Sequence, residues 1–319
     1  MKAALGAWLG ERLGRPVEIT EWRRHAEGFS WQTYTFRAGD EAFAVRREPE
    51  DGLLAPYDTE GQYRLHEALV RLGGVPVPRL RWLELDPSVL GMPFYVMDRV
   101  DGHVPVQWKP DDPIAFPDEA ARRDVGEQFV DALAAIHALD WRETGLPGPR
   151  DEVAHRERLL DEAVLVEVPL QREAIARLRA SRASSGPVAL VHGDYRIGNF
   201  ILGPDRRIAA VLDWELAHVG DPVEDIAWAG LRLFRGRSEL WSQLLAPDAF
   251  LARYEQRTGL RVSLEVLHYF TVLCTLRTIV PYLRACRAFE EGRTRDLRLA
   301  AMGHQSIHLF RHLATELAA

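Results

Sequence analysis

The stretch that decides the fold covers residues 190–230, LVHGDYRIGNFILGPDRRIAAVLDWELAHVGDPVEDIAWAG. An apolar strand leads into a loop at Asp194, and Asn199 follows five residues later, just before a second short strand. The turn at residues 203–206 sends the chain back along a third strand that ends at Asp213. Folding this hairpin brings Asn199 and Asp213 to the same open end, beside Asp194. We therefore expect two carboxylates and an amide to converge there.

These residue types suit phosphoryl transfer to an alcohol, which depends on positioning more than on covalent chemistry. One carboxylate must accept the hydroxyl proton, and oxygen ligands must hold Mg²⁺ against a triphosphate. Asp194 suits the first role, and Asn199 and Asp213 suit the second. A His-Gly-Asp sequence by itself is typical of a turn. The register of all three side chains is what favours a catalytic site.

Three parts of this segment resemble the aminoglycoside phosphotransferase (APH) family. Residues 192–199 and 213–215 resemble the family's signature, and residues 220–227 match its next motif. The sequence HGDYRIGN is similar to the variant found in members related to the kinase-like domains joined to acyl-CoA dehydrogenases. The resemblance implies an α+β, bilobal, protein-kinase-like fold, with a small antiparallel-sheet N-lobe and a larger, mainly helical C-lobe.

The resemblance also implies roles for single residues. Asp194 would be the catalytic base, and Arg196 would lie near the transferred phosphate, where a guanidinium can bind bidentately. The remaining roles are those of Asn199 and Asp213 as magnesium ligands, His192 as a residue that holds the loop, and Asp225 as an acceptor for the backbone of the loop.

The nucleotide side is predicted within the first hundred residues. The family places its phosphate-covering loop between the first two strands, where this chain has Gly28 and Ser30; an ordinary hairpin turn has the same composition. The strand at residues 42–47 carries Arg46 where kinases have a phosphate-pairing lysine. Alternation puts Arg46 and Arg47 on opposite faces, and the register favours Arg46 as the residue that faces the nucleotide.

Two further features belong to this side. The inserted helix offers Gln62, with Glu60 nearby, where the family has the glutamate that pairs with the lysine. Asp98 and Val100 match the hinge, whose backbone would bind the adenine edge; an edge strand that leaves the sheet has the same pattern. The implied cofactors are ATP, with GTP as the alternative, and Mg²⁺.

The rest of the chain is expected to form two lobes, residues 1–100 and 101–319, separated where a stretch rich in Pro and Asp begins. Alternating apolar positions predict strands, and positions three and four apart predict helices. The expected strands are 17–22, 32–37, 42–47, 79–84, 94–98, 188–191, 200–202 and 208–212; the expected helices are 59–72 and 118–139, with others that begin near 151, 169, 222, 247, 264 and 294.

Composition narrows the class of protein. The chain has 319 residues, 40 Lys plus Arg against 47 Asp plus Glu, and a net charge of −7, which argues against a nucleic-acid partner. Two cysteines cannot staple a chain of this length, so we expect a reduced, cytoplasmic protein. The apolar stretch 266–276 is shorter than a membrane span, and we expect no membrane partner.

The acceptor is predicted to meet residues that follow the catalytic segment, with Glu215, His268 and Arg277 as candidate contacts. The last hundred residues interleave Arg and Glu instead of forming the acidic surface that a polycationic aminoglycoside needs. We therefore expect a kinase whose small-molecule acceptor is neutral or anionic. The alternative is a catalytically silent pseudokinase, a nucleotide-binding or interaction module, because Arg46 and Gln62 depart from the usual Lys–Glu pair.

Overall fold

The computed structural model describes residues 1–25, 30–50, 56–106, 112–165 and 168–319. The chain divides into two compact units, Met1–Asp101 and Gly102–Ala319. The first unit carries a five-stranded sheet and the second is mainly helical. The predicted α+β class, with a sheet lobe and a helical lobe, is confirmed.

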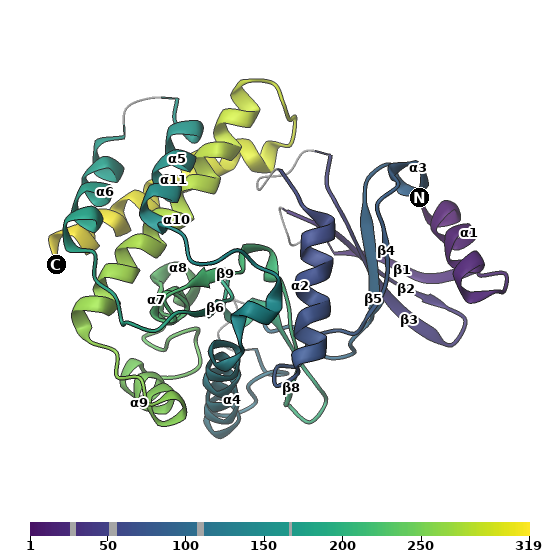
Figure 1. Ribbon diagram of the computed structural model, residues 1–319, viewed down its shortest axis with the longest axis horizontal. Coiled ribbons are helices and arrows are strands. Elements are labelled where there is room, and N and C mark those ends of the chain that lie inside the picture. Colours follow the sequence, from purple (N-terminus) through teal and green to yellow (C-terminus); the bar gives the residue numbers. More distant parts are fainter. Residues whose placement is uncertain (26–29, 51–55, 107–111, 166–167) are drawn as a thin grey trace. The chain divides into compact units, whose positions relative to one another are not determined.

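The first unit is an antiparallel sheet in the order β1-β2-β3-β5-β4, with a helix inserted after its third strand (Figure 1). Its strands are β1 (Ile19–His25), β2 (Gln32–Ala38), β3 (Glu41–Arg47), β4 (Leu80–Glu84) and β5 (Phe94–Asp98). Its helices are α1 (Lys2–Leu13), α2 (Thr59–Leu72) and the single turn α3 (Pro87–Leu90).

Local signals in the sequence explain the bounds of α2. The Asp58 side chain accepts a hydrogen bond from the N–H of Gly61 at 2.8 Å, which satisfies one of the free donors of the first turn. Gly73 ends the helix with a φ of 67°. The edge strand β1 begins later than predicted and runs on to His25, because a bulge near Glu21 (φ 49°) lets pairing with β2 resume.

The two faces of the sheet are buried by different helices, α1 on one side and α2 on the other (Figure 1). Leu5 and Leu9 of α1 belong to the cluster that contains Phe43 and Val45 of β3. Ala44 of β3 belongs to the opposite cluster, against which α2 packs. Arg46 therefore shares the α2 face, and Arg47 shares the α1 face.

The second unit is built on eight helices within the residues that the structure describes. They are α4 (Glu119–Ala138), α5 (Glu152–Ala163), α6 (Pro169–Ser181), α7 (Val223–Gly230), α8 (Arg232–Arg235), α9 (Pro247–Thr258), α10 (Leu264–Glu290) and α11 (Leu297–Ala318). By length and composition α10 could cross a membrane. Here it packs against α5, α6, α7 and α11, so its apolar residues form the core of the unit.

Two small two-stranded sheets carry the segment that decides the fold. β6 (Ala189–Val191) pairs with β9 (His218–Gly220), and β7 (Phe200–Leu202) pairs with β8 (Ile208–Val211). Short 3₁₀ turns lie between them, η2 (Ile197–Asn199) and η3 (Trp214–Leu216). The sequence pattern did not predict β9, because three residues are too few to show alternation.

Candidate active site

Asp194 follows β6, and three side chains hold its carboxylate. Oδ1 accepts hydrogen bonds from the Trp228 indole Nε1 at 2.9 Å and from Arg196 Nε at 3.0 Å. Oδ2 accepts a hydrogen bond from Asn199 Nδ2 at 2.6 Å. The side chain of Asp194 is 14% exposed. The carboxylate is thus fixed in orientation yet still reachable from solvent.

Asn199 ties the loop to the following hairpin. Its Nδ2 also donates to the backbone carbonyl of Asp194 at 2.9 Å, so one amide nitrogen binds both the side chain and the backbone of Asp194. The carbonyl of Asn199 accepts a hydrogen bond from the N–H of Leu212 at 2.7 Å. The next residue along the chain is Asp213. The hairpin therefore brings Asp194, Asn199 and Asp213 together, as the spacing predicts.

Asp213 is held in an unusual backbone conformation. Its φ is 68° and its ψ is 57°, in the left-handed region that costs a non-glycine residue about 1–2 kcal/mol. The residue before it is anchored twice, because Leu212 also accepts a hydrogen bond from His192 Nε2 at 2.9 Å. Strain that is retained in this way is common at functional sites.

Arg196 is the cation of this cluster. Burial lowers its pKa, but the charges of Asp194 and Asp213, with a smaller contribution from Glu215, raise it above its usual value. Its guanidinium also lies 5.8 Å from the ring of Phe234. The cluster thus contains three carboxylates around one guanidinium, and Glu215, predicted to contact the acceptor, belongs to it.

The backbone of the loop is held by Asp225 of α7. Its carboxylate accepts the N–H groups of His192 at 2.7 Å and Gly193 at 2.8 Å, and it lies 3.2 Å from Nε2 of His137. Burial raises the pKa of Asp225, but the hydrogen bond from His137 and the charges around it lower the value below its usual range. Asp225 thus stays ionised and makes the backbone contacts that the resemblance implies.

His192 holds the loop as a neutral side chain. Its Nδ1 accepts a hydrogen bond from the N–H of Asp194 at 3.1 Å, so the proton is on Nε2, which donates to Leu212. Burial lowers the pKa of His192 despite the nearby carboxylates. The imidazole therefore connects the two strands and carries no charge at neutral pH.

Gly193 is required by both conformation and space. Its φ is 83°. A Cβ at this position would lie 2.6 Å from Arg277 Nη2, and closer still to the carbonyl oxygen of Leu216. The guanidinium of Arg277 occupies the place that a side chain at position 193 would need, which explains why a glycine precedes Asp194.

Two predicted acceptor contacts are placed elsewhere. Arg277 is 3% exposed and pairs with Glu224 at 2.5 Å, while its other terminal nitrogen donates to the carbonyl of Gly193. Both terminal nitrogens of Arg277 thus bind protein groups on the buried, inner side of the loop, where the predicted contact with the acceptor does not fit. His268 lies two and a half turns earlier on α10, and its Nδ1 is 3.8 Å from Glu316 of α11.

On the predicted nucleotide side, Arg46 lies on the α2 face, with its guanidinium 5.4 Å from the ring of Trp31. Burial lowers the pKa of His66 on α2 to about 4, and the charge of Arg46 adds to this shift. Arg47, on the other face, donates to the carbonyl of Leu90 at 2.9 Å and is part of the fold.

The other predicted nucleotide residues are placed as follows. Glu60 pairs with Arg64 on its own helix, and Gln62 is half-buried on α2. The carboxylate of Asp98 accepts a hydrogen bond from Arg81 at 2.5 Å. Ser30 is half-buried just before β2, Val100 is half-buried just after β5, and Gly28 lies outside the described residues.

The sequence analysis did not single out Trp228. Trp228 stands three residues after Asp225, so both side chains project from one face of α7. Since Asp225 was expected at the loop, this spacing could have placed Trp228 there too.

The donors present suit a magnesium ion. Asn199 uses its amide nitrogen on Asp194, which leaves the amide oxygen as its ligand atom. Asp213 follows Leu212, which is hydrogen-bonded to the backbone of Asn199, and its charge acts on Arg196. Mg²⁺ prefers such oxygen donors, usually with several waters.

A sheet unit followed by a helical unit, whose loop presents a carboxylate, an amide and a second carboxylate, defines a kinase-like phosphotransferase. The model of the APH phosphotransferase enzyme family matches residues 21–265, and the chain belongs to this family. The predicted resemblance to members related to the kinase-like domains joined to acyl-CoA dehydrogenases is also confirmed. The chain is 31% identical over 232 residues to acyl-CoA dehydrogenase family member 11 of Gallus gallus, and 30% identical over 236 residues to member 10 of Mus musculus. These matches cover 67% and 71% of this chain, but the chain spans only 28% and 21% of those relatives.

Solved structures share the fold at lower identity. A putative aminoglycoside phosphotransferase of Ralstonia eutropha has a TM-score of 0.75 at 22% identity, covering 99% of this chain and 98% of its own. An aminoglycoside phosphotransferase in complex with ADP and hygromycin B has a TM-score of 0.65 at 14% identity, covering 97% and 98%. Aminoglycoside 2'-phosphotransferase-IIIa in complex with GDP has a TM-score of 0.66 at 16% identity, covering 98% and 99%.

Proposed function

We propose that this protein transfers the γ-phosphoryl group of ATP, in a Mg²⁺-dependent reaction, to a hydroxyl group of a small molecule. The observation that carries the proposal is the Asp194 carboxylate, fixed by Asn199 and Arg196 on a loop whose hairpin brings Asp213 alongside. Membership in a phosphotransferase family supports it, as do the nucleotide complexes of structures with the same fold.

In this proposal each side chain has one task. Asp194 accepts the proton of the acceptor hydroxyl and aims its oxygen at phosphorus. Arg196 compensates charge on the transferred group. Asn199 and Asp213 would hold Mg²⁺, which would neutralise the triphosphate. Ser30, Arg46, Asp98 and Val100 of the first unit, with Gly28, are the proposed nucleotide contacts.

The acceptor is proposed to be neutral or anionic. A polycationic acceptor needs a strongly acidic surface, but the last hundred residues, which follow the catalytic segment, interleave Arg and Glu. A cytoplasmic location is also part of the proposal, supported by the free thiols of Cys274 and Cys286.

The test begins with nucleotide binding, which needs no acceptor. Thermal unfolding is measured with ATP or GTP, with and without Mg²⁺, on the wild type and on Asp213→Ala. A nucleotide at a hundredfold excess over its dissociation constant should stabilise the wild type by about 2.7 kcal/mol. The magnesium-dependent part should disappear in Asp213→Ala. If neither nucleotide shifts the transition, the kinase proposal fails.

Transfer is then measured by following ADP release across hydroxyl-bearing compounds grouped by charge. Asp194→Ala should keep nucleotide binding and lose transfer, while Asp248→Ala, which changes an exposed carboxylate on α9, is the matched control. Equal turnover in the wild type and Asp194→Ala would remove Asp194 as the base. ADP release only with polycations would refute the proposed acceptor charge.

A further inference from the structure

Trp228 makes a contact with Asp194 that the proposed reaction does not otherwise use. Its indole N–H donates to Oδ1 at 2.9 Å, and its side chain is buried. The other donors to this carboxylate, Arg196 and Asn199, are proposed to bind phosphate and metal. Only Trp228, of the three, has no proposed ligand of its own, so its contact can persist throughout the reaction.

The contact controls a degree of freedom that matters for a base. A carboxylate rotates about a broad, roughly two-fold torsion, so a single donor does not fix its plane. Trp228 binds Oδ1 while Asn199 binds Oδ2, and together they set the plane of the Asp194 carboxylate. The two donors come from different elements, α7 and η2.

The indole is itself held from the inner side by Arg277 of α10. The Arg277 guanidinium lies 4.7 Å from the Trp228 ring centroid, within the range of a cation–π contact. The same guanidinium binds the carbonyl of Gly193 and pairs with Glu224. Arg277 thus contacts the loop, the indole and α7 at once.

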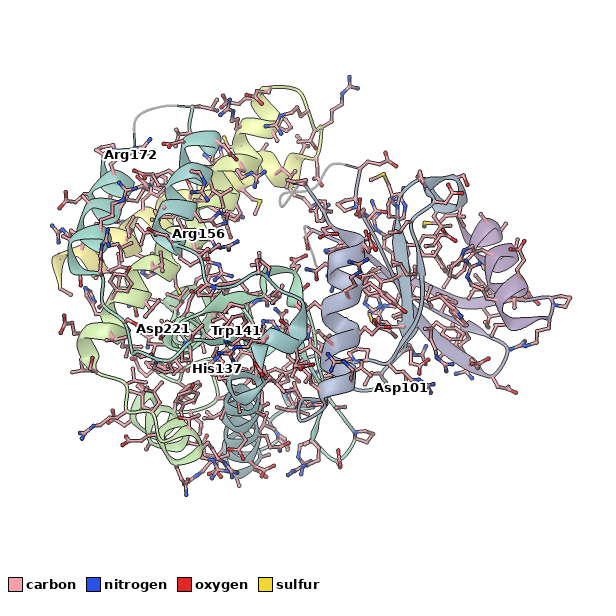
Figure 2. The ribbon with its side chains drawn as sticks, in the orientation of Figure 1. Asp101, His137, Trp141, Arg156, Arg172 and Asp221 are labelled. Atoms are coloured by element: carbon pink, nitrogen blue, oxygen red, sulfur yellow. The ribbon has the colours of Figure 1, made fainter. Side chains whose placement is uncertain are left out.

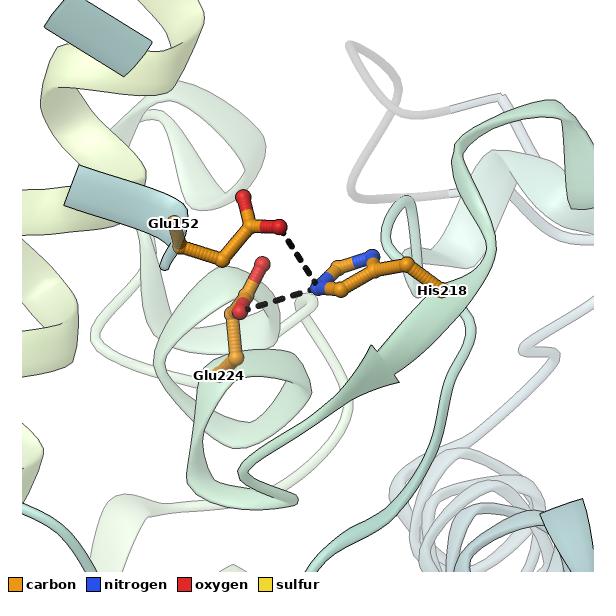
Figure 3. A group of neighbouring side chains, drawn as sticks. All are labelled: Glu152, His218 and Glu224. Carbon is orange, nitrogen blue, oxygen red and sulfur yellow. Dashed lines mark hydrogen bonds and ion pairs between the residues drawn. The ribbon is translucent and has the colours of Figure 1, made fainter. Parts of the chain in front are cut away.

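Glu224 also belongs to a buried cluster with His218 and Glu152 (Figure 3). His218 Nε2 lies 3.2 Å from Glu224 and 3.8 Å from Glu152 of α5. The ligand atoms of these three residues lie within 4.8 Å of one another, close enough to hold a metal ion.

The charges in the cluster argue against a metal. Glu224 is paired with Arg277. Glu152 is paired with Arg150 and, at 2.9 Å, with the buried Arg156, which is labelled in Figure 2. The two carboxylates are already neutralised, so a divalent cation would bring unbalanced charge into a buried site. The cluster is better described as an ionic anchor that joins α5, β9, α7 and α10.

We propose that Trp228 is a positioning residue for Asp194: its indole N–H sets the plane of the carboxylate, and Arg277, anchored by Glu224, holds the indole. The inference rests on the proposed function for its catalytic consequence. The contact itself is independent of that function and can be tested separately.

The contact is tested by nuclear magnetic resonance on protein with ¹⁵N-labelled tryptophan, which has nine indole N–H groups. Trp228→Phe identifies the signal of Trp228 by its loss. Asp194→Asn removes the charged acceptor and should move that signal upfield, while Asp248→Asn, at an exposed position on α9, should leave it in place. Arg277→Lys keeps a positive charge but cannot reach both Gly193 and Glu224, and should also move the signal.

If Asp194→Asn leaves the Trp228 signal unchanged, the proposal is overturned. If Asp194→Asn moves the Trp228 signal but Arg277→Lys does not, Arg277 has no part in holding the indole, and that half of the proposal is overturned. These outcomes do not depend on whether the protein is a kinase.

The catalytic consequence is tested with Mg·ATP as the probe and water as the acceptor, where water attacks the γ-phosphorus and ADP leaves. Trp228→Phe keeps an aromatic ring beside Arg277 but lacks the N–H. We expect kcat to fall by about 10- to 100-fold, the worth of one hydrogen bond to a charged group, with KM for ATP changed less than about twofold. Trp241→Phe, another buried tryptophan of the same unit, is the matched control and should change neither.

A rise in KM for ATP as large as the fall in kcat would indicate a merely structural role and overturn the proposal. An equal fall in kcat in Trp241→Phe would do the same. A wild type that hydrolyses no ATP would count against the proposed function, and the indole signal would then decide the inference alone.

Discussion

Gly193→Ala tests whether the close packing around the catalytic loop is as tight as the structure shows. Two costs are expected. The first is conformational, because an alanine at a φ of 83° loses about 1–2 kcal/mol relative to glycine. The second is steric, because the new Cβ would lie 2.6 Å from Arg277 Nη2 and would force the loop away from it.

The second cost can be estimated from the contact that is lost. Moving the loop breaks the hydrogen bond from Arg277 to the carbonyl of Gly193, and a hydrogen bond to a charged group contributes about 1.5–3 kcal/mol. The total is therefore about 2.5–5 kcal/mol. In a unit of this size each kcal/mol lowers Tm by roughly 2–4 °C, so Tm should fall by about 5–20 °C.

Gly145→Ala separates the two costs. Gly145 also has a positive φ, 75°, but a Cβ there would meet nothing within 4 Å. It should therefore show the conformational cost alone, a fall in Tm of about 2–8 °C. Both variants are compared by differential scanning calorimetry at one pH. If Gly193→Ala is no less stable than Gly145→Ala, the packing argument is refuted.

Three other changes give distinct expectations. Asp225→Asn should reduce the free energy of unfolding by about 2–4 kcal/mol in a denaturant titration, because its amide cannot accept hydrogen bonds from both loop N–H groups; an unchanged midpoint would contradict this. Burial lowers the pKa of His218, but the charges of Glu224 and Glu152 raise it more, so the pKa in the folded protein lies above its usual value. The protonated His218 therefore stabilises the fold below about pH 6.5, and this stabilisation is lost as the pH rises through the folded-state pKa. His218→Gln should thus be more destabilising at pH 6 than at pH 9, and the opposite order in denaturant midpoints would count against it. Burial raises the pKa of the Cys274 thiol and, with Glu290, that of the half-buried Cys286, so an aromatic disulfide reagent should modify Cys286 slowly and Cys274 only after unfolding.

Much of the fold could be predicted because its signals are local. The bounds of α2 follow from the Asp58 cap and from Gly73, and alternation along β3 separates Arg46 from Arg47. The convergence of Asp194, Asn199 and Asp213 also follows from one hairpin, whose length and turn are visible in the sequence. Such features require no knowledge of what packs against them.

The residues that the sequence misplaced depend on distant packing. Arginines are rarely buried, so Arg277 was expected to face an acceptor. Its burial depends on Glu224, 53 positions earlier, and on the space left by Gly193. Trp228 was not singled out, because a large aromatic side chain on an apolar helix usually belongs to the core.

The arrangement of α7 explains why these distant contacts belong together. Seven of its eight residues are buried, and three of them are polar or carry a polar group directed at the loop or its anchor: Glu224, Asp225 and Trp228. Asp225 binds the loop backbone, Trp228 binds the Asp194 carboxylate, and Glu224 holds the arginine beneath both. Because these side chains share one short helix, a displacement of α7 moves the backbone and the carboxylate of the loop by the same amount. The orientation of Asp194 within its loop is therefore preserved when the surrounding unit shifts, which is the property that a positioned base requires.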